Sequence, residues 1–256
     1  MDKNKTQKEF LRLVEIMQRL RAKKGCPWDR KQTHKSLLPY ILEEAYEVIE
    51  EINKNDKVHM KEELGDLLLQ VVFHAQIAAE AGDFTIAEVA KGISDKLVTR
   101  HPHIFGNKKL KTAAAVREFW EKHKKEVKKR DSVIDGVPVA LPALLRARRL
   151  QSKAISAGFK WKNDQGIIAK INEELAEVKQ AVKSKKKKHI EEEIGDLLFA
   201  VTLLGYHYGV NAENALNLTS NKFIKRFKYI EKDLKVGMTE SNILKLWKKA
   251  KKENIK

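Results

Sequence analysis

The sequence predicts an all-α protein made of two tandem, homologous helical-bundle domains. Only 12 Gly and 5 Pro occur in 256 residues, and this composition favours helices over turn-rich sheets. Apolar residues recur three and four positions apart, as they do on the buried face of a helix. An acidic pattern also occurs twice, with every carboxylate displaced by 130 positions between the copies. A duplicated helical domain is the simplest explanation.

Five amphipathic helices are expected in the first half of the chain. The Gly-Cys-Pro-Trp-Asp stretch at 25–29 ends the first of them and begins a polar loop, and Gly82 ends the third. Thr85 and Glu88 have the spacing of a capping box for the fourth helix, and residues 101–106 are expected to form a loop. The expected helices span residues 6–23, 37–53, 58–81, 86–100 and 112–129.

A linker is expected at residues 131–143, where Gly136, Pro138 and Pro142 cluster. It would join a first domain at residues 1–130 to a second at 144–256. Five further helices are expected after it, with a basic loop between the second and third. These helices span residues 144–157, 167–183, 190–208, 211–234 and 239–250.

Composition limits the possible functions only broadly. The net charge of +17 favours acidic partners such as nucleotides, nucleic acid or anionic surfaces, although lysine- and glutamate-rich surfaces also occur in heat-adapted proteins. No apolar run approaches the roughly 20 residues that cross a bilayer. The polar N-terminus does not resemble a signal peptide, and the single Cys26 fits a reducing compartment. A cytoplasmic protein without a membrane partner is expected.

The duplicated pattern is Glu-Glu-x-x-Glu followed, 16 residues after its last glutamate, by Glu-x-x-Asp. Positions three apart on a helix differ by about 60° around its axis, so they share a stripe. Both stripes border the apolar faces of their helices, and antiparallel packing of the two helices would therefore bring four carboxylates together. Glu43 and Glu173 point further outward. The four expected ligands are Glu44, Glu47, Glu63 and Asp66 in the first copy, and Glu174, Glu177, Glu193 and Asp196 in the second.

Four clustered carboxylates repel one another unless a cation is present. Hard oxygen ligands suit Mg²⁺, with Mn²⁺ as an alternative, whereas helical di-iron sites use Glu-x-x-His motifs. A carboxylate-bound cation commonly receives the phosphates of a substrate. The alternative is a solvated helix flank with ordinary ion pairs. The occurrence of the acidic pattern twice at equal spacing disfavours this alternative.

Basic and aromatic side chains also recur in both copies. Two pairs, each with a Lys and an Arg four residues apart, lie on one face of their helix and could supply positive charge to phosphates; generic surface charge is the alternative. A Trp beside lysines in each copy could stack on a base or simply pack. These residues are Lys96, Arg100 and Trp120 in the first copy, and Lys222, Arg226 and Trp247 in the second.

These motifs resemble the MazG family of nucleoside triphosphate pyrophosphohydrolases. The resemblance covers nearly the whole chain and includes residues 25–29, both acidic sets, and the His-Pro-His-Ile-Phe-Gly stretch at 101–106. It implies tandem domains of the all-α NTP pyrophosphatase type, a homodimer, and Mg²⁺-dependent conversion of nucleoside triphosphates to monophosphate and pyrophosphate.

The resemblance also implies roles for individual residues. The two acidic sets would hold the metal. Nucleotide contacts would come from the second copy and, at the equivalent positions of the first copy, from Lys96, Arg100 and Trp120. Gln70 and His74 continue the first acidic stripe, where the second copy has Ala200 and Leu204, so the first pocket is expected to be more polar. The implied nucleotide contacts in the second copy are Lys170, Ile171, Asn172, Glu173, Glu174, His189, Ile190, Glu191, Glu192, Lys222, Phe223, Ile224, Lys225, Arg226 and Trp247.

The mechanism expected from these residues is hydrolysis at the α-phosphate. Glu44 or Glu174 would orient the attacking water or accept its proton. Lysine and arginine would stabilise the leaving pyrophosphate, with Lys96 and Arg100 acting in the first copy and Lys222 and Arg226 in the second.

Three alternatives stay open at this point. The enzyme could be a narrow pyrophosphatase for dUTP or phosphoribosyl-ATP, or one copy could be catalytic and the other a dimerisation element. A basic helical nucleic-acid-binding protein is less favoured, because the sequence has no helix-turn-helix, zinc or RNA-binding aromatic motif.

Overall fold

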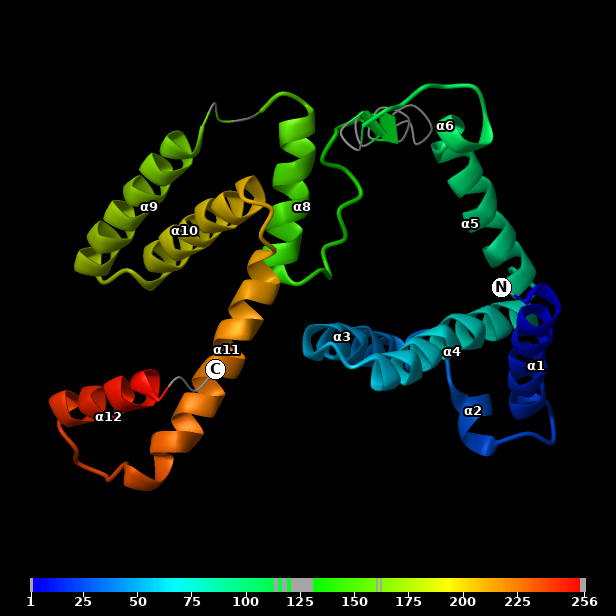
Figure 1. The fold of residues 1–256 in the computed structure, drawn as a ribbon, viewed down its shortest axis with the longest axis horizontal. Helices are drawn as coiled ribbons and strands as arrows, with labels where there is room; N and C mark the ends of the chain where they lie inside the picture. Colours follow the sequence, from blue (N-terminus) through cyan, green and yellow to red (C-terminus); the bar gives the residue numbers. More distant parts are fainter. Residues whose placement is uncertain are drawn as a thin grey trace. The chain divides into compact units, whose positions relative to one another are not determined.

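The computed structural model describes residues 2–112, 115–116, 119–120, 131–159, 161 and 163–253, and throughout these residues the regular structure is helical. The all-α prediction is therefore confirmed. The chain divides into two compact units, Met1–Lys111 and Thr112–Lys256 (Figure 1). The sequence instead predicts that the first domain ends at residue 130. Residues 121–130 lie outside the described part, so the boundary at 130 and the linker at 131–143 stay predictions.

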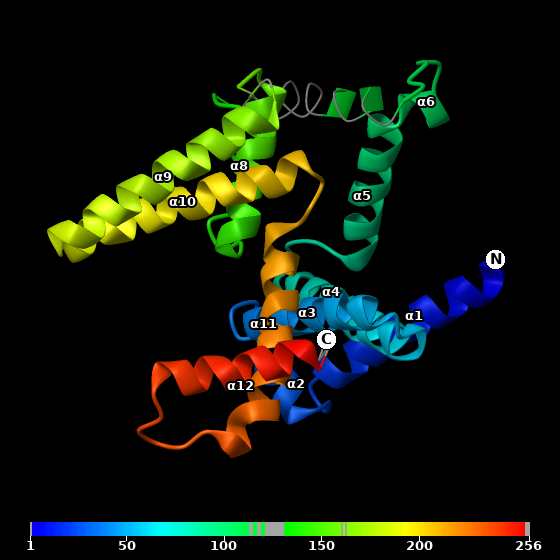
Figure 2. The same ribbon diagram turned by 60° about the vertical axis from the view of Figure 1, so that its left-hand side comes forward.

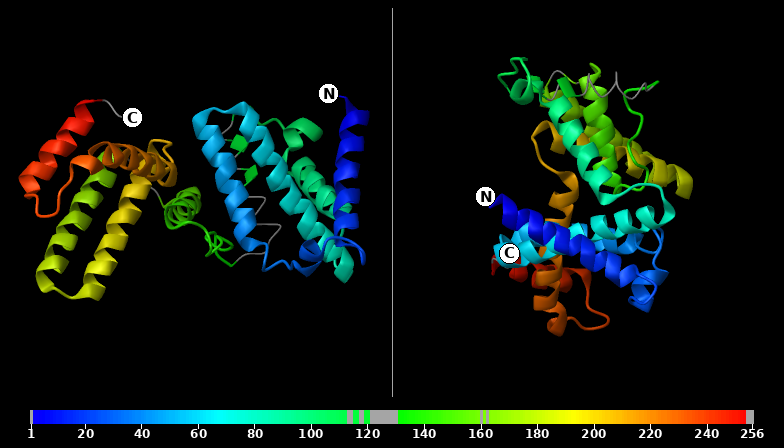
Figure 3. Two further views of the ribbon diagram at one scale, coloured as in Figure 1. Left: turned by 90° about the horizontal axis from the view of Figure 1, so that it is seen from below. Right: turned by 90° about the vertical axis from the view of Figure 1, so that its right-hand side faces the viewer.

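The first unit is built on an antiparallel helical hairpin. Helix α3 packs along α4, α1 and α5 contact α4, and α2 contacts α1 (Figures 1 and 3). The short α6 packs against α5. The helices are α1 (Lys3–Arg21), α2 (Pro27–Lys31), α3 (Leu38–Lys54), α4 (Lys57–Ala81), α5 (Ile86–Arg100) and α6 (Pro102–Phe105).

Local capping sets the ends of these helices. Helix α1 begins at Lys3 rather than Thr6, because the Asp2 side chain accepts the Lys5 backbone N–H. Asn55 adopts a left-handed conformation at φ 57° and closes α3. The predicted capping box of Thr85 and Glu88 is present at the start of α5.

Two segments predicted as loops are short helices. Residues 27–31 form α2 and residues 102–105 form α6, and each begins with a proline at its first position. Proline suits that position because its missing N–H would have no partner there in any helix. In the sequence alone, each of these prolines indicated only a break between helices.

The core of the first unit joins α1 to the α3–α4 hairpin. Its buried members are apolar side chains from α1, the residue before α3, and α4: Val14, Met17, Leu37, Val72 and Phe73. Because these side chains come from three segments, the core fixes the position of the hairpin.

Arg21 ties the end of α1 to two other segments. Its guanidinium donates to both Glu80 oxygens, with Nη2 2.7 Å from Oε2, and to the backbone carbonyls of Asp29 and Gln32. The Arg21 side chain is only 7% exposed. A buried guanidinium with four acceptors is costly to replace, because those acceptors would lose their partner.

We expect Arg21→Met to lower the free energy of unfolding by about 2 kcal/mol at neutral pH, since the partner Glu80 is partly exposed. Urea denaturation of the full chain measures this. Arg12→Met is the matched control, because the Arg12–Glu9 pair lies exposed within one helix and should contribute less than about 0.5 kcal/mol. Equal effects of the two substitutions would contradict the assigned role of Arg21.

This contribution should depend on pH in one direction. The hydrogen bond from Arg21 is the main reason why the pKa of Glu80 lies below its usual value. The stabilisation is therefore present above the carboxyl pKa of the unfolded chain, and it is lost as pH falls through the lowered pKa of the folded state.

The second unit repeats the hairpin with different neighbours. Helix α9 packs along α10, α8 contacts α10, and α11 contacts α8, α10 and α12 (Figure 2). The elements are α8 (Ala143–Ser156), α9 (Asp164–Ser184), α10 (Lys187–His207), α11 (Ala212–Ile230), the 3-10 turn η1 (Glu231–Asp233) and α12 (Glu240–Lys252).

Helix α10 differs from the prediction in a way that matters for the site. It begins at Lys187 rather than Ile190, so the predicted basic loop is shorter and His189 lies in the first turn of the helix. His189 and Glu193 are therefore four residues apart on one helical face.

Trp120 is described as helical, but most of the helix predicted at 112–129 lies outside the described residues. Within the described part of the chain, no helix is both long and apolar enough to cross a membrane.

Candidate functional site

The first acidic cluster lies on the α3–α4 hairpin. Glu44 and Glu47 come from consecutive turns of α3, and Glu63 faces them from α4. One carboxylate oxygen of each lies within 4.8 Å of the others. The spacing read from the sequence thus corresponds to a real juxtaposition of three predicted ligands.

Burial and mutual repulsion act on the protonation of this cluster. Burial is the largest cause that raises the pKa of Glu44, and the charge of Asp66 is the next. The pKa of Glu63 is raised by burial and then by the charges of Glu47 and Asp66. Asp66 therefore lies close enough to act electrostatically, although its oxygens are outside the group of three.

The second cluster repeats the arrangement on α9 and α10. Glu174, Glu177 and Glu193 each offer an oxygen within 4.8 Å of the others. Glu174 is only 5% exposed, and the pKa of Glu177 is raised by burial and then by its bond to Glu174. Asp196, the fourth predicted ligand, lies one turn beyond Glu193 and is exposed.

The second cluster also contains two basic side chains that bond to its carboxylates. Lys170 Nζ lies 2.8 Å from a Glu174 oxygen and 2.9 Å from a Glu173 oxygen. His189 Nε2 lies 3.1 Å from a Glu193 oxygen. The bonds to Glu174 and Glu173 raise the pKa of Lys170, and the bond to Glu174 is the larger cause. The cluster is therefore partly neutralised.

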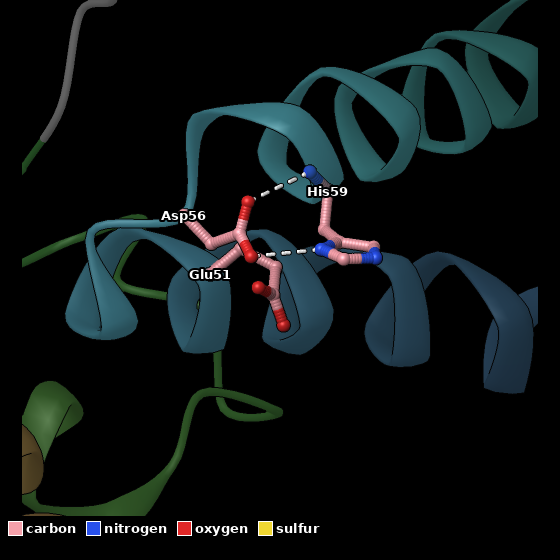
Figure 4. Close-up of side chains that lie close together, drawn as sticks. All are labelled: Glu51, Asp56 and His59. Carbon is pink, nitrogen blue, oxygen red and sulfur yellow. Dashed lines mark hydrogen bonds and ion pairs between the residues drawn. The ribbon is translucent and has the colours of Figure 1, made fainter.

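The first cluster has no equivalent counterions among the described ion pairs. Tyr40 occupies the position of Lys170, and His59 the position of His189. His59 bonds instead to Asp56, at 2.8 Å (Figure 4). The two clusters therefore share their carboxylates but differ in charge.

Figure 4 shows that His59 belongs to a third group with Glu51 and Asp56. Helix capping explains this group, because Asp56 accepts the backbone N–H groups of Val58 and His59 at the start of α4. Lys54 already pairs with Glu51 at 2.6 Å. We therefore assign a structural role to this third group.

The chemistry of the two acidic clusters fits a hard divalent cation. Their donors are carboxylate oxygens, which Mg²⁺ and Mn²⁺ prefer. The raised pKa values of Glu44, Glu63 and Glu177 have burial and neighbouring carboxylates as causes, and a bound cation would relieve that repulsion.

The predicted phosphate-binding residues of the second unit lie on α11. Lys222 and Arg226 are half-buried, whereas Phe223, Ile224 and Lys225 are exposed. The rings of Phe223 and Trp247 pack at 5.2 Å between centroids, so Trp247 takes part in packing between α11 and α12. Arg226 Nε is buried without a hydrogen-bond partner in the described structure.

The other predicted contacts lie near the second cluster or on α5. Asn172 is exposed and Ile171 half-buried on α9, while Glu191 and Glu192 are exposed and Ile190 is half-buried on α10. In the first unit, Lys96 is exposed and Arg100 is half-buried on α5. Trp120, which falls in the second unit, is half-buried. The roles of all these residues stay predictions.

The model of the MazG nucleotide pyrophosphohydrolase domain matches the chain twice, at residues 32–105 and 162–230. These two ranges contain the α3–α4 and α9–α10 hairpins with both acidic clusters. The chain belongs to the MazG family. Membership makes it a hydrolase of the nucleotide pyrophosphohydrolase class, and it confirms the resemblance and the tandem arrangement.

Two relatives that align over nearly their whole length support the same assignment, and a third aligns over half of its length. A Thermotoga maritima protein named nucleoside triphosphate pyrophosphohydrolase/pyrophosphatase MazG is 47% identical, over 94% of this chain and 95% of the relative. The Escherichia coli K12 nucleoside triphosphate pyrophosphohydrolase is 40% identical, over 95% and 97% of the two chains. A Bacillus subtilis protein, YabN, is 44% identical over 95% of this chain but 52% of its own length.

Two contacts in or near the acidic clusters were not predicted from the sequence. One is the pairing of Lys170 with Glu174 and of His189 with Glu193, which four-residue spacing on a helix could have indicated. The other is a bond between His34 and His74, whose Nδ1 atoms lie 2.7 Å apart. These residues are 40 positions apart, so no local pattern predicts their contact.

Proposed function

We propose that this protein hydrolyses nucleoside triphosphates, both ribo and deoxyribo, to nucleoside monophosphate and pyrophosphate with Mg²⁺, or Mn²⁺, held by its acidic clusters. The observation that carries the proposal is the duplicated group of three close carboxylates on equivalent hairpins. The names of the relatives from T. maritima and E. coli support the substrate class.

Each cluster would hold the cation through its glutamates, with Asp66 or Asp196 as the fourth ligand. A bound cation would bridge to the triphosphate and lower the pKa of a water. Glu44 is the better candidate for orienting that water in the first unit, because its raised pKa makes it a stronger proton acceptor. Its counterpart Glu174 is engaged by Lys170 in the described state.

The basic residues would act on the phosphates. Lys96 and Arg100, and likewise Lys222 and Arg226, would stabilise negative charge on the leaving pyrophosphate. The buried Nε of Arg226 supports this role in the second unit, because an unsatisfied guanidinium group favours an anionic partner.

A homodimer is part of this proposal. Large apolar side chains remain exposed on α10, with Ile194, Leu198 and Val201 at 44%, 49% and 45%. Exposed apolar faces of this kind commonly mark protein–protein contacts. Analytical ultracentrifugation of the full chain at micromolar concentration should therefore give twice the 29.4 kDa monomer mass.

Product analysis tests the reaction directly. With ATP or dATP and Mg²⁺, we expect monophosphate and pyrophosphate in equal amounts, resolved by ³¹P NMR or anion exchange. Hydrolysis in ¹⁸O-labelled water should place the label in the monophosphate, because the attack is at the α-phosphate. Formation of diphosphate and orthophosphate would contradict the proposed reaction.

A further inference from the structure

A polar stripe continues along α4 beyond the first acidic cluster. Asp66, Gln70 and His74 are successive members, each four residues after the last, so they lie on one face of the helix. From Asp66 to His74 the helix rises about 12 Å. The stripe thus leads away from the carboxylates over a distance that a nucleotide can span.

The structure anchors both ends of this stripe to the segments before and within α3. One end follows Glu63, which lies close to Glu44 and Glu47. At the other end His74 bonds to His34, just before α3. Their rings stack with an interplanar angle of 8°. Gln70 lies between these two points on the same side of α4.

Two polar atoms of the stripe are buried without a partner. Gln70 is 6% exposed, yet its Oε1 accepts no hydrogen bond, and the buried Nε2 of His74 is also unpaired in the described part of the structure. A buried polar atom without a partner costs about 1–3 kcal/mol. Such a cost is commonly offset where a ligand supplies the missing partner.

Packing alone does not require these polar groups. The equivalent positions of the second hairpin hold Ala200 and Leu204, and Ala200 is buried there at 6% exposed. The same hairpin is therefore built with apolar side chains in one unit and polar ones in the other. The polarity of the first unit needs another reason.

We propose that Gln70 and the His34–His74 pair bind the base edge of the nucleotide in the first unit, and so make that site selective among bases. This inference rests on the proposed function, which places the phosphates at the carboxylates. Gln70 Oε1 accepts from an N–H group of the base. His74 Nε2 donates or accepts according to the tautomer that its bond to His34 selects. The second unit lacks this means of discrimination.

The test isolates the first site in the full chain. Glu193→Ala/Asp196→Ala disables the second cluster. In this chain, isothermal titration with Mg²⁺ measures the affinity for α,β-methylene analogues of ATP, GTP, CTP and UTP and of their deoxyribo counterparts, and a separate titration without nucleotide measures Mn²⁺ binding. We expect the best and worst bases to differ by at least about tenfold. Adding Gln70→Met/His74→Leu should weaken the best base by about tenfold and bring the four affinities together.

Two controls separate recognition from folding. Gln70→Met alone nearly conserves the side-chain volume, so this variant should fold even if the double variant does not. It should show part of the loss of affinity for the best base. Gln76→Met removes the same amide from the same helix, where Gln76 bonds to Glu80, and should leave the base preference unchanged.

Three results would overturn the inference. Unchanged affinities with a higher melting temperature would assign Gln70 and His74 to packing. An equal loss for all four bases, larger for ribo than for deoxyribo analogues, would assign them to the sugar hydroxyls. Mn²⁺ binding without any analogue binding would show that the first unit holds no nucleotide. Absence of Mn²⁺ binding would instead contradict the proposed function itself.

Discussion

Removing the two predicted metal ligands on α4 together with the two on α10 should abolish hydrolysis. For the variant Glu63→Ala/Asp66→Ala/Glu193→Ala/Asp196→Ala we expect kcat/KM for ATP and dATP with Mg²⁺ to fall at least about 1,000-fold. The reason is that a bound cation contributes several kcal/mol to stabilisation of the transition state, and each 1.36 kcal/mol is tenfold in rate. A panel of NTPs and dNTPs measures the effect.

The two paired variants divide this loss between the units. Equal losses from Glu63→Ala/Asp66→Ala and Glu193→Ala/Asp196→Ala would indicate two working sites, and a silent pair would identify a structural copy. Glu15→Ala/Glu240→Ala is the matched control, since it removes one exposed acid from each unit outside the groups of three. Full activity in the fourfold variant would contradict the proposed sites. Tighter nucleic-acid binding together with unchanged activity would favour the nucleic-acid alternative.

The charge difference between the clusters should appear as a difference in metal affinity. We expect Lys170→Met to tighten Mn²⁺ binding at the second cluster by about tenfold, because the ammonium group occupies the oxygens of Glu174 that a cation would use. Conversely, Tyr40→Lys should weaken binding at the first cluster by about tenfold, since it introduces the same ion pair with Glu44. Titration of free Mn²⁺ by electron paramagnetic resonance, without nucleotide, measures both.

Each half of this exchange has its own control. Each titration uses a chain whose other cluster carries the paired alanine substitutions, so that one site is read at a time. Lys183→Met removes a positive charge from the end of α9 and should change little. Tyr40→Met removes the ring that contacts Trp28 without adding charge, and so separates the loss of packing from the gain of a cation. Looser Mn²⁺ binding in Lys170→Met would show that Lys170 supports the metal instead of competing with it.

The carboxylate clusters could be predicted from sequence because their information is local. Glu44 and Glu47 share a stripe by helical geometry, and so do Glu63 and Asp66. The short connection at residues 53–57 left antiparallel packing as the simplest way to join the two helices. The exact repeat of this spacing in residues 174–196 made a solvated surface face improbable. Helix ends were less predictable at α2, α6 and α10, because proline and lysine there permit either a loop or a first turn.

What the sequence by itself determined is the all-α class, the duplication and the carboxylates that face one another, since all of these follow from periodicity and spacing. Only the tertiary structure decided which charges share a cluster and which polar atoms are buried without partners. Lys170 pairs with Glu174 in the second cluster. His189 pairs with Glu193, whereas His59, at the same place in the repeat, bonds to Asp56. His34 meets His74 across 40 residues. Such pairings depend on the three-dimensional position of each side chain and on competition among partners, which no local spacing records.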